Sequence, residues 1–393
     1  MSPRWAMLLV IFFTRVSMGF QFQSIAALAP FVVADLALSY GEMGLLMGLF
    51  LLPGVVIALP GGLLGRRFGS LRVTVAGLGL MVAGGMLVSY GVGVNSAALG
   101  RTVSGIGGVL INIMLARMVA DWFRGREIQT AMGVMLAAWP FGMALALVVL
   151  GPLAAATSWR VAEYLTVAAA GLALALIALG YREPPGERVT AEPATLGLDL
   201  PRRVWALAVS AGIAWALLNA AVIVVASFAP LFLMAQGVSV GKAGFLTGLA
   251  LWISIVSVPL GGLIADRLHR PRLQVVGGCL ATALAIVCVT RAPLPAVWLV
   301  VTGVLAGMAP GIMMALLPRA VGPEHLATAL GVYYSLFYLG MALSQTAAGI
   351  VRDVTGDPAM PLLFGALLMA AAAPAVFVFW RIEGPPAAGD PGV

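Results

Sequence analysis

The chain has 393 residues, of which 62% are hydrophobic and 9% charged, with a mean hydropathy of +1.06 and a net charge of +7. Soluble globular domains carry about 25% charged residues, so this composition excludes that class. It predicts a protein that crosses a membrane many times.

Twelve apolar runs are long enough to be transmembrane helices. A helix needs about 20 apolar residues to cross the hydrocarbon of a bilayer. The alternating pattern of barrel strands does not occur, and helices satisfy their own backbone groups in lipid. We therefore predict an all-α membrane protein with spans at approximately 5–34, 43–64, 73–92, 97–119, 128–150, 159–180, 204–228, 243–264, 273–290, 295–317, 327–350 and 360–380.

The distribution of basic residues predicts the orientation. If the N-terminus is cytoplasmic, sixteen of the 22 Lys and Arg residues fall in cytoplasmic segments and four fall outside. Cytoplasmic loops carry the excess of such residues, so we expect both termini in the cytoplasm. The charges are spread over short turns, which favours contact with the headgroups of the lipid bilayer. We expect no nucleic-acid partner.

An internal repeat divides the chain into two halves. With an offset of 200 residues, the segment from Gly41 to Arg72 aligns without a gap on the segment from Gly241 onward, and an offset of 198 aligns Ala131 with Ala329 and the residues that follow them. Two six-helix bundles related by pseudo-symmetry are predicted, at 1–181 and 204–381, with a cytoplasmic linker at 182–203 and a cytoplasmic tail at 382–393. Repeats of this kind place a substrate site between the halves, near mid-membrane.

Three motifs resemble those of one family. GGLLGRRFGSLR at Gly61–Arg72 and GGLIADRLHRPR at Gly261–Arg272 are similar to the loop between helices 2 and 3 of the major facilitator superfamily. RTVSGIGG at Arg101–Gly108 is similar to its helix-4 signature. The resemblance covers essentially the whole chain and implies the major facilitator fold and transport of a small molecule by alternating access. We expect a monomer without a cofactor.

The duplicated loop departs from the family pattern at one position. In the family, an aspartate there helps to latch the two halves on the cytoplasmic side. Asp266 and Arg267 match the pattern in the second half, whereas Arg66 and Arg67 stand in the first. The resemblance implies a gating role for these four residues. Alternatively, Arg66 is one more positive-inside residue.

Acidic residues and histidines are expected to lie away from the membrane centre. All 15 acidic residues fall in loops, tails or terminal turns of predicted helices, with Glu163 the hardest to place, and both histidines fall in cytoplasmic loops. Intramembrane proton relays use such side chains. We therefore expect no buried carboxylate to carry a proton. The substrate then brings its own proton or sodium ion, or transport is by exchange or facilitated diffusion, and the co-transported ion stays open.

Two arginines fall inside predicted spans, Arg15 in the first and Arg101 in the fourth. A buried arginine costs about 2.5–3.5 kcal/mol on insertion scales and usually faces a cavity or a partner. Its planar fork of donors suits carboxylates and other oxyanions. We predict that both bind a small organic or inorganic anion. The alternatives are that Arg15 extends to the cytoplasmic interface and that Arg101 bonds helix carbonyls.

Aromatic and amide side chains complete the candidate site. Under the repeat, Trp215 takes the place of Arg15, and Asn219 that of Gly19. Charge on one side and ring faces on the other suit an anion with an organic body, although aromatic residues at helical spacing also serve packing. The predicted substrate-binding residues are Arg15, Gln23, Arg101, Trp139, Trp215, Asn219, Tyr334 and Tyr338.

Other functions stay open. An arginine in helix 1 is similar to the cyanate and nitroimidazole transporter branch of the family. A Met-rich cavity around Met308, Met313 and Met314 would suit uptake or efflux of hydrophobic, drug-like compounds. A non-transporting receptor is a further alternative. The predicted spans hold no catalytic or metal-binding cluster, so we expect neither an enzyme nor a metal site. Short loops favour a multi-pass plasma-membrane protein, as in a bacterial inner membrane.

Overall fold

The computed structural model describes residues 3–58, 60–124, 127–184, 200–268 and 270–384, so most of the predicted linker and tail lie outside the described residues. Within this part, twelve helical spans are long and apolar enough to cross a membrane. This confirms the predicted number of spans and the all-α class.

The described residues form seventeen helices because three of the predicted spans are interrupted and the short α6 is a further helix after the second span. The predicted first span consists of α1 to α3, the second of α4 and α5, and the tenth of α14 and α15. Two interruptions coincide with Pro53 before α5 and Pro310 at the start of α15, since proline lacks the backbone N–H that continues a helix. The helices are α1 (Pro3–Phe22), α2 (Ser24–Ala27), α3 (Ala29–Asp35), α4 (Tyr40–Leu49), α5 (Gly54–Ile57), α6 (Gly61–Phe68), α7 (Ser70–Tyr90), α8 (Val94–Trp122), α9 (Ile128–Ala156), α10 (Trp159–Gly180), α11 (Arg202–Ala235), α12 (Val240–Leu268), α13 (Pro271–Arg291), α14 (Pro295–Leu305), α15 (Pro310–Ala320), α16 (Pro323–Thr355) and α17 (Met360–Glu383).

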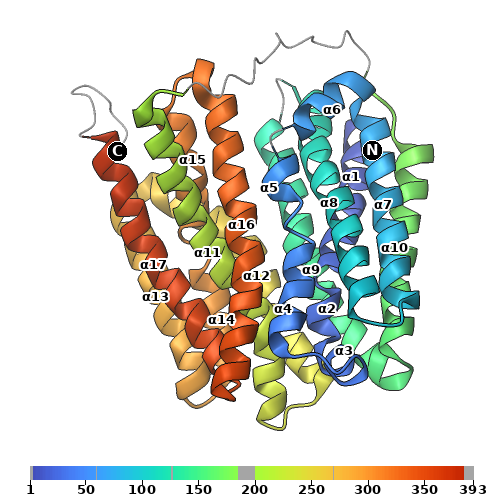
Figure 1. Ribbon diagram of the computed structural model, residues 1–393. Coiled ribbons are helices and arrows are strands. Elements are labelled where there is room, and N and C mark those ends of the chain that lie inside the picture. Colours follow the sequence, from blue (N-terminus) through green and yellow to red (C-terminus); the bar gives the residue numbers. More distant parts are fainter. Residues whose placement is uncertain (1–2, 59, 125–126, 185–199, 269, 385–393) are drawn as a thin grey trace.

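The helices form two groups that stand side by side (Figure 1). We call α1–α10 the first helix group and α11–α17 the second helix group. Both chain termini lie at one end of the molecule, the terminal end, and the opposite end is the far end (Figure 1). The main contacts between the groups join α4 to α16 and α9 to α12.

Glycines let the two groups touch through their backbones. A Cβ atom on Gly44 of α4 would lie 2.2 Å from the Gln345 carbonyl oxygen of α16. A Cβ atom on Gly244 of α12 would lie 2.0 Å from the Leu147 carbonyl oxygen of α9. Small residues permit such close helix approach. All four residues lie in the parts of their helices toward the far end, so the groups are joined tightly there.

A carboxylate from the second helix group caps a helix of the first at the far end. Asp353 of α16 accepts hydrogen bonds from the backbone N–H groups of Tyr40 (2.9 Å) and Gly41 (2.7 Å). The first N–H groups of a helix have no partner within it and favour a negative charge. The guanidinium of Arg352 lies 5.1 Å from the centroid of the Tyr40 ring. These contacts join the two helix groups at the far end.

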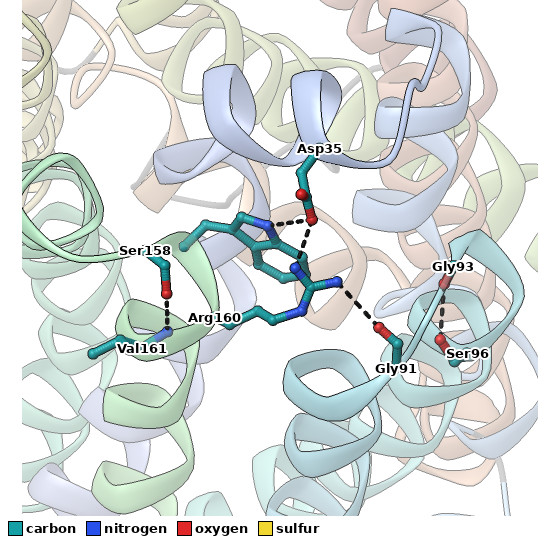
Figure 2. A network of polar contacts seen from close by, with 8 residues as sticks. Asp35, Gly91, Gly93, Ser96, Ser158, Arg160 and Val161 are labelled. Atoms are coloured by element: carbon teal, nitrogen blue, oxygen red, sulfur yellow. Dashed lines mark hydrogen bonds and ion pairs between the residues drawn. The ribbon is translucent and has the colours of Figure 1, made fainter.

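A second polar network joins three spans of the first helix group at the far end (Figure 2). The Asp35 carboxylate accepts hydrogen bonds from Trp159 Nε1 at 2.9 Å and from the Arg160 guanidinium at 2.6 Å. Arg160 also donates to the Gly91 carbonyl oxygen at 3.4 Å. The network ties the end of α3 to the end of α7 and the start of α10.

This network predicts a pH dependence. The hydrogen bonds from Trp159, and then those from Arg160, lower the pKa of Asp35 below its ordinary value. The stabilisation is therefore complete above the unfolded pKa of about 3.9 and is lost as the pH falls through the lower folded value. Asp35→Asn should lower stability at neutral pH by about 1 kcal/mol or less, because the pair is exposed. The melting temperatures of the two proteins should approach each other as the pH falls below about 4; a difference that grows on acidification would contradict the assignment.

Candidate functional site

Arg15 lies in the second half of α1, and its side chain is buried. Its guanidinium donates a hydrogen bond to Asn112 Oδ1 of α8. Asn112 Nδ2 in turn donates to the Tyr338 hydroxyl at 3.0 Å. Because Tyr338 belongs to α16, this polar chain crosses from the first helix group to the second.

The charge of Arg15 has no counterion among the described residues. The ion pairs of that part of the chain involve other arginines, all more exposed. Arg15 Nε is buried and has no hydrogen-bond partner. An unpaired buried charge is costly, and arginine cannot release its proton. The Arg15 guanidinium therefore lacks both a counterion and one hydrogen-bond acceptor among the described residues.

An aromatic wall of the second helix group faces this charge. Trp215 of α11 stacks against Tyr333 and Phe337 of α16, with ring centroids 6.4 and 6.2 Å apart. Phe337 contacts Tyr334 and Tyr338 edge to face, and both tyrosines are close enough to Arg15 to interact electrostatically. The structure thus brings Arg15, Tyr334, Tyr338 and Trp215 into one region.

Glycine makes room for one of these rings. The Tyr338 ring packs against Gly54 of α5, where a Cβ atom would lie 2.4 Å from Cγ of the ring. Asn219 lies one turn after Trp215, and its amide donates to the Trp215 carbonyl oxygen at 2.9 Å. Asn219 therefore bonds within its own helix.

Asn112 is a residue that the predicted site did not include, because a lone amide in an apolar helix was only a weak candidate. It follows Arg101 by eleven residues, which is about three turns of a helix, so both side chains lie on the same face of α8. This helical spacing from Arg101 is the sequence feature from which Asn112 could have been predicted. The choice of Arg15 as its partner depends on the packing of α1 against α8 and could not be read from the sequence.

The geometry of Arg101 corrects its assignment as a substrate ligand. Its guanidinium donates to the carbonyl oxygens of Leu46 (3.1 Å), Gln21 (2.8 Å) and Phe22 (2.8 Å), and it lies 4.7 Å from the centroid of the Phe50 ring. The side chain is 1% exposed. All three nitrogens are occupied by the backbone of α1 and α4, so Arg101 joins helices within the first group.

Gln23 and Trp139 do not belong to the region around Arg15. Gln23 donates to the Ala226 carbonyl oxygen of α11 at 3.1 Å and is buried between the two groups. Trp139 of α9 stacks on Phe22 with ring centroids 5.0 Å apart. Both side chains are used in packing near the end of α1, and we remove them from the candidate site.

Glu163 contradicts the expectation that no carboxylate is buried in the helix bundle. It lies in the second turn of α10 and is 0% exposed. Glu163 Oε1 accepts hydrogen bonds from Ser24 Oγ at 3.1 Å and Thr166 Oγ1 at 3.3 Å, whereas Oε2 has no partner. Terminal turns are usually exposed, but α1, α2 and α7 enclose this one. From the sequence we expected no proton carrier because no carboxylate was placed inside the bundle. The burial of Glu163 removes that reason.

Comparison with known proteins identifies the family. The model of the Major Facilitator Superfamily matches residues 11–345 and, in a second overlapping match, 221–392. The chain belongs to the major facilitator superfamily. It is accordingly a multi-pass membrane transporter with a small-molecule substrate.

The individual relatives compared next have low sequence identity to this chain. The chain is 22% identical to the hexuronate transporter of Bacillus subtilis (strain 168) over 91% of this chain and 90% of that protein. It is 25% identical to the lysosomal dipeptide transporter MFSD1 of Danio rerio, over 95% and 86%. The crystal structure of a bacterial homologue of the human lysosomal transporter Spinster, inward-facing and occupied, has a TM-score of 0.79 at 17% identity and covers 98% of this chain and 100% of that one. None of these supports the cyanate and nitroimidazole branch.

The superfamily loop residues lie at the terminal end. Arg67 is exposed on α6, with its guanidinium 5.4 Å from the centroid of the Phe68 ring. Asp266 and Arg267 are exposed near the end of α12. The side chain of Arg66 lies outside the described part of the structure. Their gating role remains a prediction.

Two apolar cavities lie away from Arg15. One of about 40 Å³ lies within the second helix group and is lined by residues such as Leu251 and Met369. The other, of about 260 Å³, lies between α1, α9 and α10 and includes Phe13 and Leu172, which are exposed. Neither is lined by Arg15, Asn112 or Tyr338.

Proposed function

We propose that this transporter moves a small organic anion by alternating access and that Arg15 binds the anionic group. The observation that carries the proposal is the buried Arg15 guanidinium, which has no counterion among the described residues and an unpartnered Nε. A substrate carboxylate would supply both the missing charge and the missing hydrogen-bond acceptor.

The surroundings of Arg15 favour an anion with an organic body. Trp215, Tyr334 and Phe337 offer ring faces and edges opposite the charge, and such mixed sites orient a ligand through few polar groups. A hexuronate, the substrate in the name of one relative, carries a carboxylate. The named dipeptide transporter is also compatible, since a dipeptide ends in a carboxylate.

We further propose that the two helix groups are pseudo-symmetric. The contact of Gly44 with Gln345 and the contact of Gly244 with Leu147 involve the same positions of the repeat, because offsets of 200 and 198 residues relate them. Rocking of two such halves about a central site would expose it to either side in turn.

The proposed orientation places both termini in the cytoplasm of a bacterial cell, with the protein in the inner membrane. The excess of arginine in the segments of the terminal end supports it. The close contacts at the far end then correspond to an inward-facing state. A structural neighbour is described as inward-facing, which agrees with this proposal.

Thermal stabilisation of the purified protein by matched anionic, neutral and cationic solutes tests the proposal. Anions alone should raise the melting temperature, because a ligand stabilises the state that binds it. Arg15→Gln should abolish the shift, and Arg117→Gln, which changes a partly exposed arginine paired with Asp121, should retain it. Equal shifts in wild type and Arg15→Gln would contradict the role of Arg15. Shifts with hydrophobic neutral compounds alone would favour the drug-like substrates, and the absence of transport in vesicles would favour a receptor.

A further inference from the structure

We propose that Glu163, with Gln21 and Ser24, forms a buried proton-binding site in the first helix group, and that its protonation is coupled to the contact between the two groups. The proposal does not depend on an anionic substrate. It uses a carboxylate that the Arg15 site does not include.

The cluster holds more hydrogen-bond acceptors than donors. Glu163 Oε2 and Gln21 Oε1 are both buried without a partner. One of the two hydrogens of the Gln21 amide nitrogen is donated to the Met81 carbonyl oxygen of α7 at 3.1 Å, and the amide oxygen of the same side chain cannot donate. A buried acceptor without a donor is costly, and a buried carboxylate more so.

The two neighbouring hydroxyls do not make up this deficit. Ser24 Oγ is within 3.1 Å of Glu163 Oε1 and 3.0 Å of the Gln21 carbonyl oxygen. Thr166 Oγ1 is within 3.3 Å of the same Oε1 and 2.8 Å of the Glu163 carbonyl oxygen. Each hydroxyl has one hydrogen to share between two acceptors. A proton on Glu163 converts the carboxylate to a neutral acid and supplies the missing donor.

Arg101 is the charged group that acts on Glu163. Its nitrogens are occupied by three backbone carbonyls, so it attracts the carboxylate without forming an ion pair with it among the described residues. The side chains that bond Glu163 are neutral, namely Ser24 from α2 and Thr166 from α10. Gln21 of α1 is linked to Glu163 through Ser24, and its neighbours on α7, the Met81 carbonyl and Gly85, are also neutral. A metal cation would be repelled by Arg101, whereas a proton would leave a neutral acid beside it.

The segment Gln21–Ser24 connects this site to the second helix group. α1 ends at Phe22 and α2 begins at Ser24, so the segment spans a break in the first span. Ser24 bonds Glu163, and the adjacent Gln23 donates to the Ala226 carbonyl oxygen of α11. A change in the charge of Glu163 alters the hydrogen bond of Ser24 and thereby the position of the residue that contacts the other group.

Infrared difference spectroscopy of the protein in lipid membranes, titrated with acid and base, tests for the bound proton. We expect one carboxylic-acid band that disappears as the pH is raised and that is lost in Glu163→Gln at every pH. Glu324→Gln changes an exposed carboxylate and should keep the band. Identical spectra of wild type and Glu163→Gln would overturn the proposal. The band does not require a substrate, so its loss is separable from a failure of the Arg15 proposal.

Distances between spin labels on the exposed residues Val92 and Val354 test the coupling. We expect the distance distribution of the wild type to shift with pH and that of Glu163→Gln to keep its low-pH form throughout. Glu163→Asp retains a titratable group and should shift with pH, which separates loss of the proton from a folding defect. A pH response that Glu163→Gln retains would contradict the coupling. A shift driven by sodium at constant pH would show that the cation is not a proton.

Discussion

Arg101→Met is expected to lower the free energy of unfolding by about 3–5 kcal/mol. This is the range for breaking a buried charged interaction by removing one of its two partners. The substitution leaves the carbonyl oxygens of Leu46, Gln21 and Phe22 without donors in a site that water does not reach. It also removes the positive charge that attracts the Glu163 carboxylate. Thermal melting of the purified protein, followed by tryptophan fluorescence, measures the loss.

Arg101→Lys and Arg67→Met are the matched variants. An ammonium group donates from a single nitrogen, so lysine should retain part of the stability but not all of it. Arg67 is exposed, and its replacement by methionine should leave the melting temperature close to that of the wild type. A melting temperature of Arg101→Met that equals the wild-type value would show that the three hydrogen bonds contribute little.

Gly44→Ala is expected to prevent closure of the far end. The added Cβ atom would lie 2.2 Å from the Gln345 carbonyl oxygen, and both atoms belong to helical backbones that cannot yield locally. The two helix groups must therefore separate at this point. In a helix interior alanine is favoured over glycine by about 1 kcal/mol, so weakening of α4 cannot account for an opened far end.

Spin-label distances between Val92 and Val354 measure the separation, after replacement of the free cysteines Cys279 and Cys288. The mean distance should increase in Gly44→Ala. Gly244→Ala should change it in the same direction, because its Cβ atom meets the Leu147 carbonyl oxygen at 2.0 Å. Gly79→Ala in α7 is the control, since a Cβ atom there has no neighbour within 4 Å. An unchanged distance in Gly44→Ala would mean that the helices can slide apart without opening the far end.

The spans could be predicted from the sequence because the signal is local. Twenty apolar residues in a row are a sufficient condition for a candidate span, and the number of spans needed no tertiary information. The breaks before Ser24, Gly54 and Pro310 were not predicted. A helix interruption within an apolar run depends on which neighbouring helix satisfies the freed backbone groups, as Arg101 does for Gln21 and Phe22.

The candidate site was predicted only in part, for the same reason. Side-chain type singled out Arg15, Tyr334 and Tyr338, which lie together. It could not separate Arg15 from Arg101, because both are arginines in apolar helices and differ only in what they contact. Glu163 was placed near a helix end, and only packing shows that this end is buried.

Exchange of a labelled organic monoanion across the membrane of proteoliposomes tests the central claim most directly. The anion should be the one that gives the largest thermal shift with the purified protein. The account predicts exchange by wild type, retention in Arg117→Gln, and loss in Arg15→Gln although the variant remains folded. Exchange by Arg15→Gln at the wild-type rate would contradict the assignment of Arg15 as the anion-binding residue.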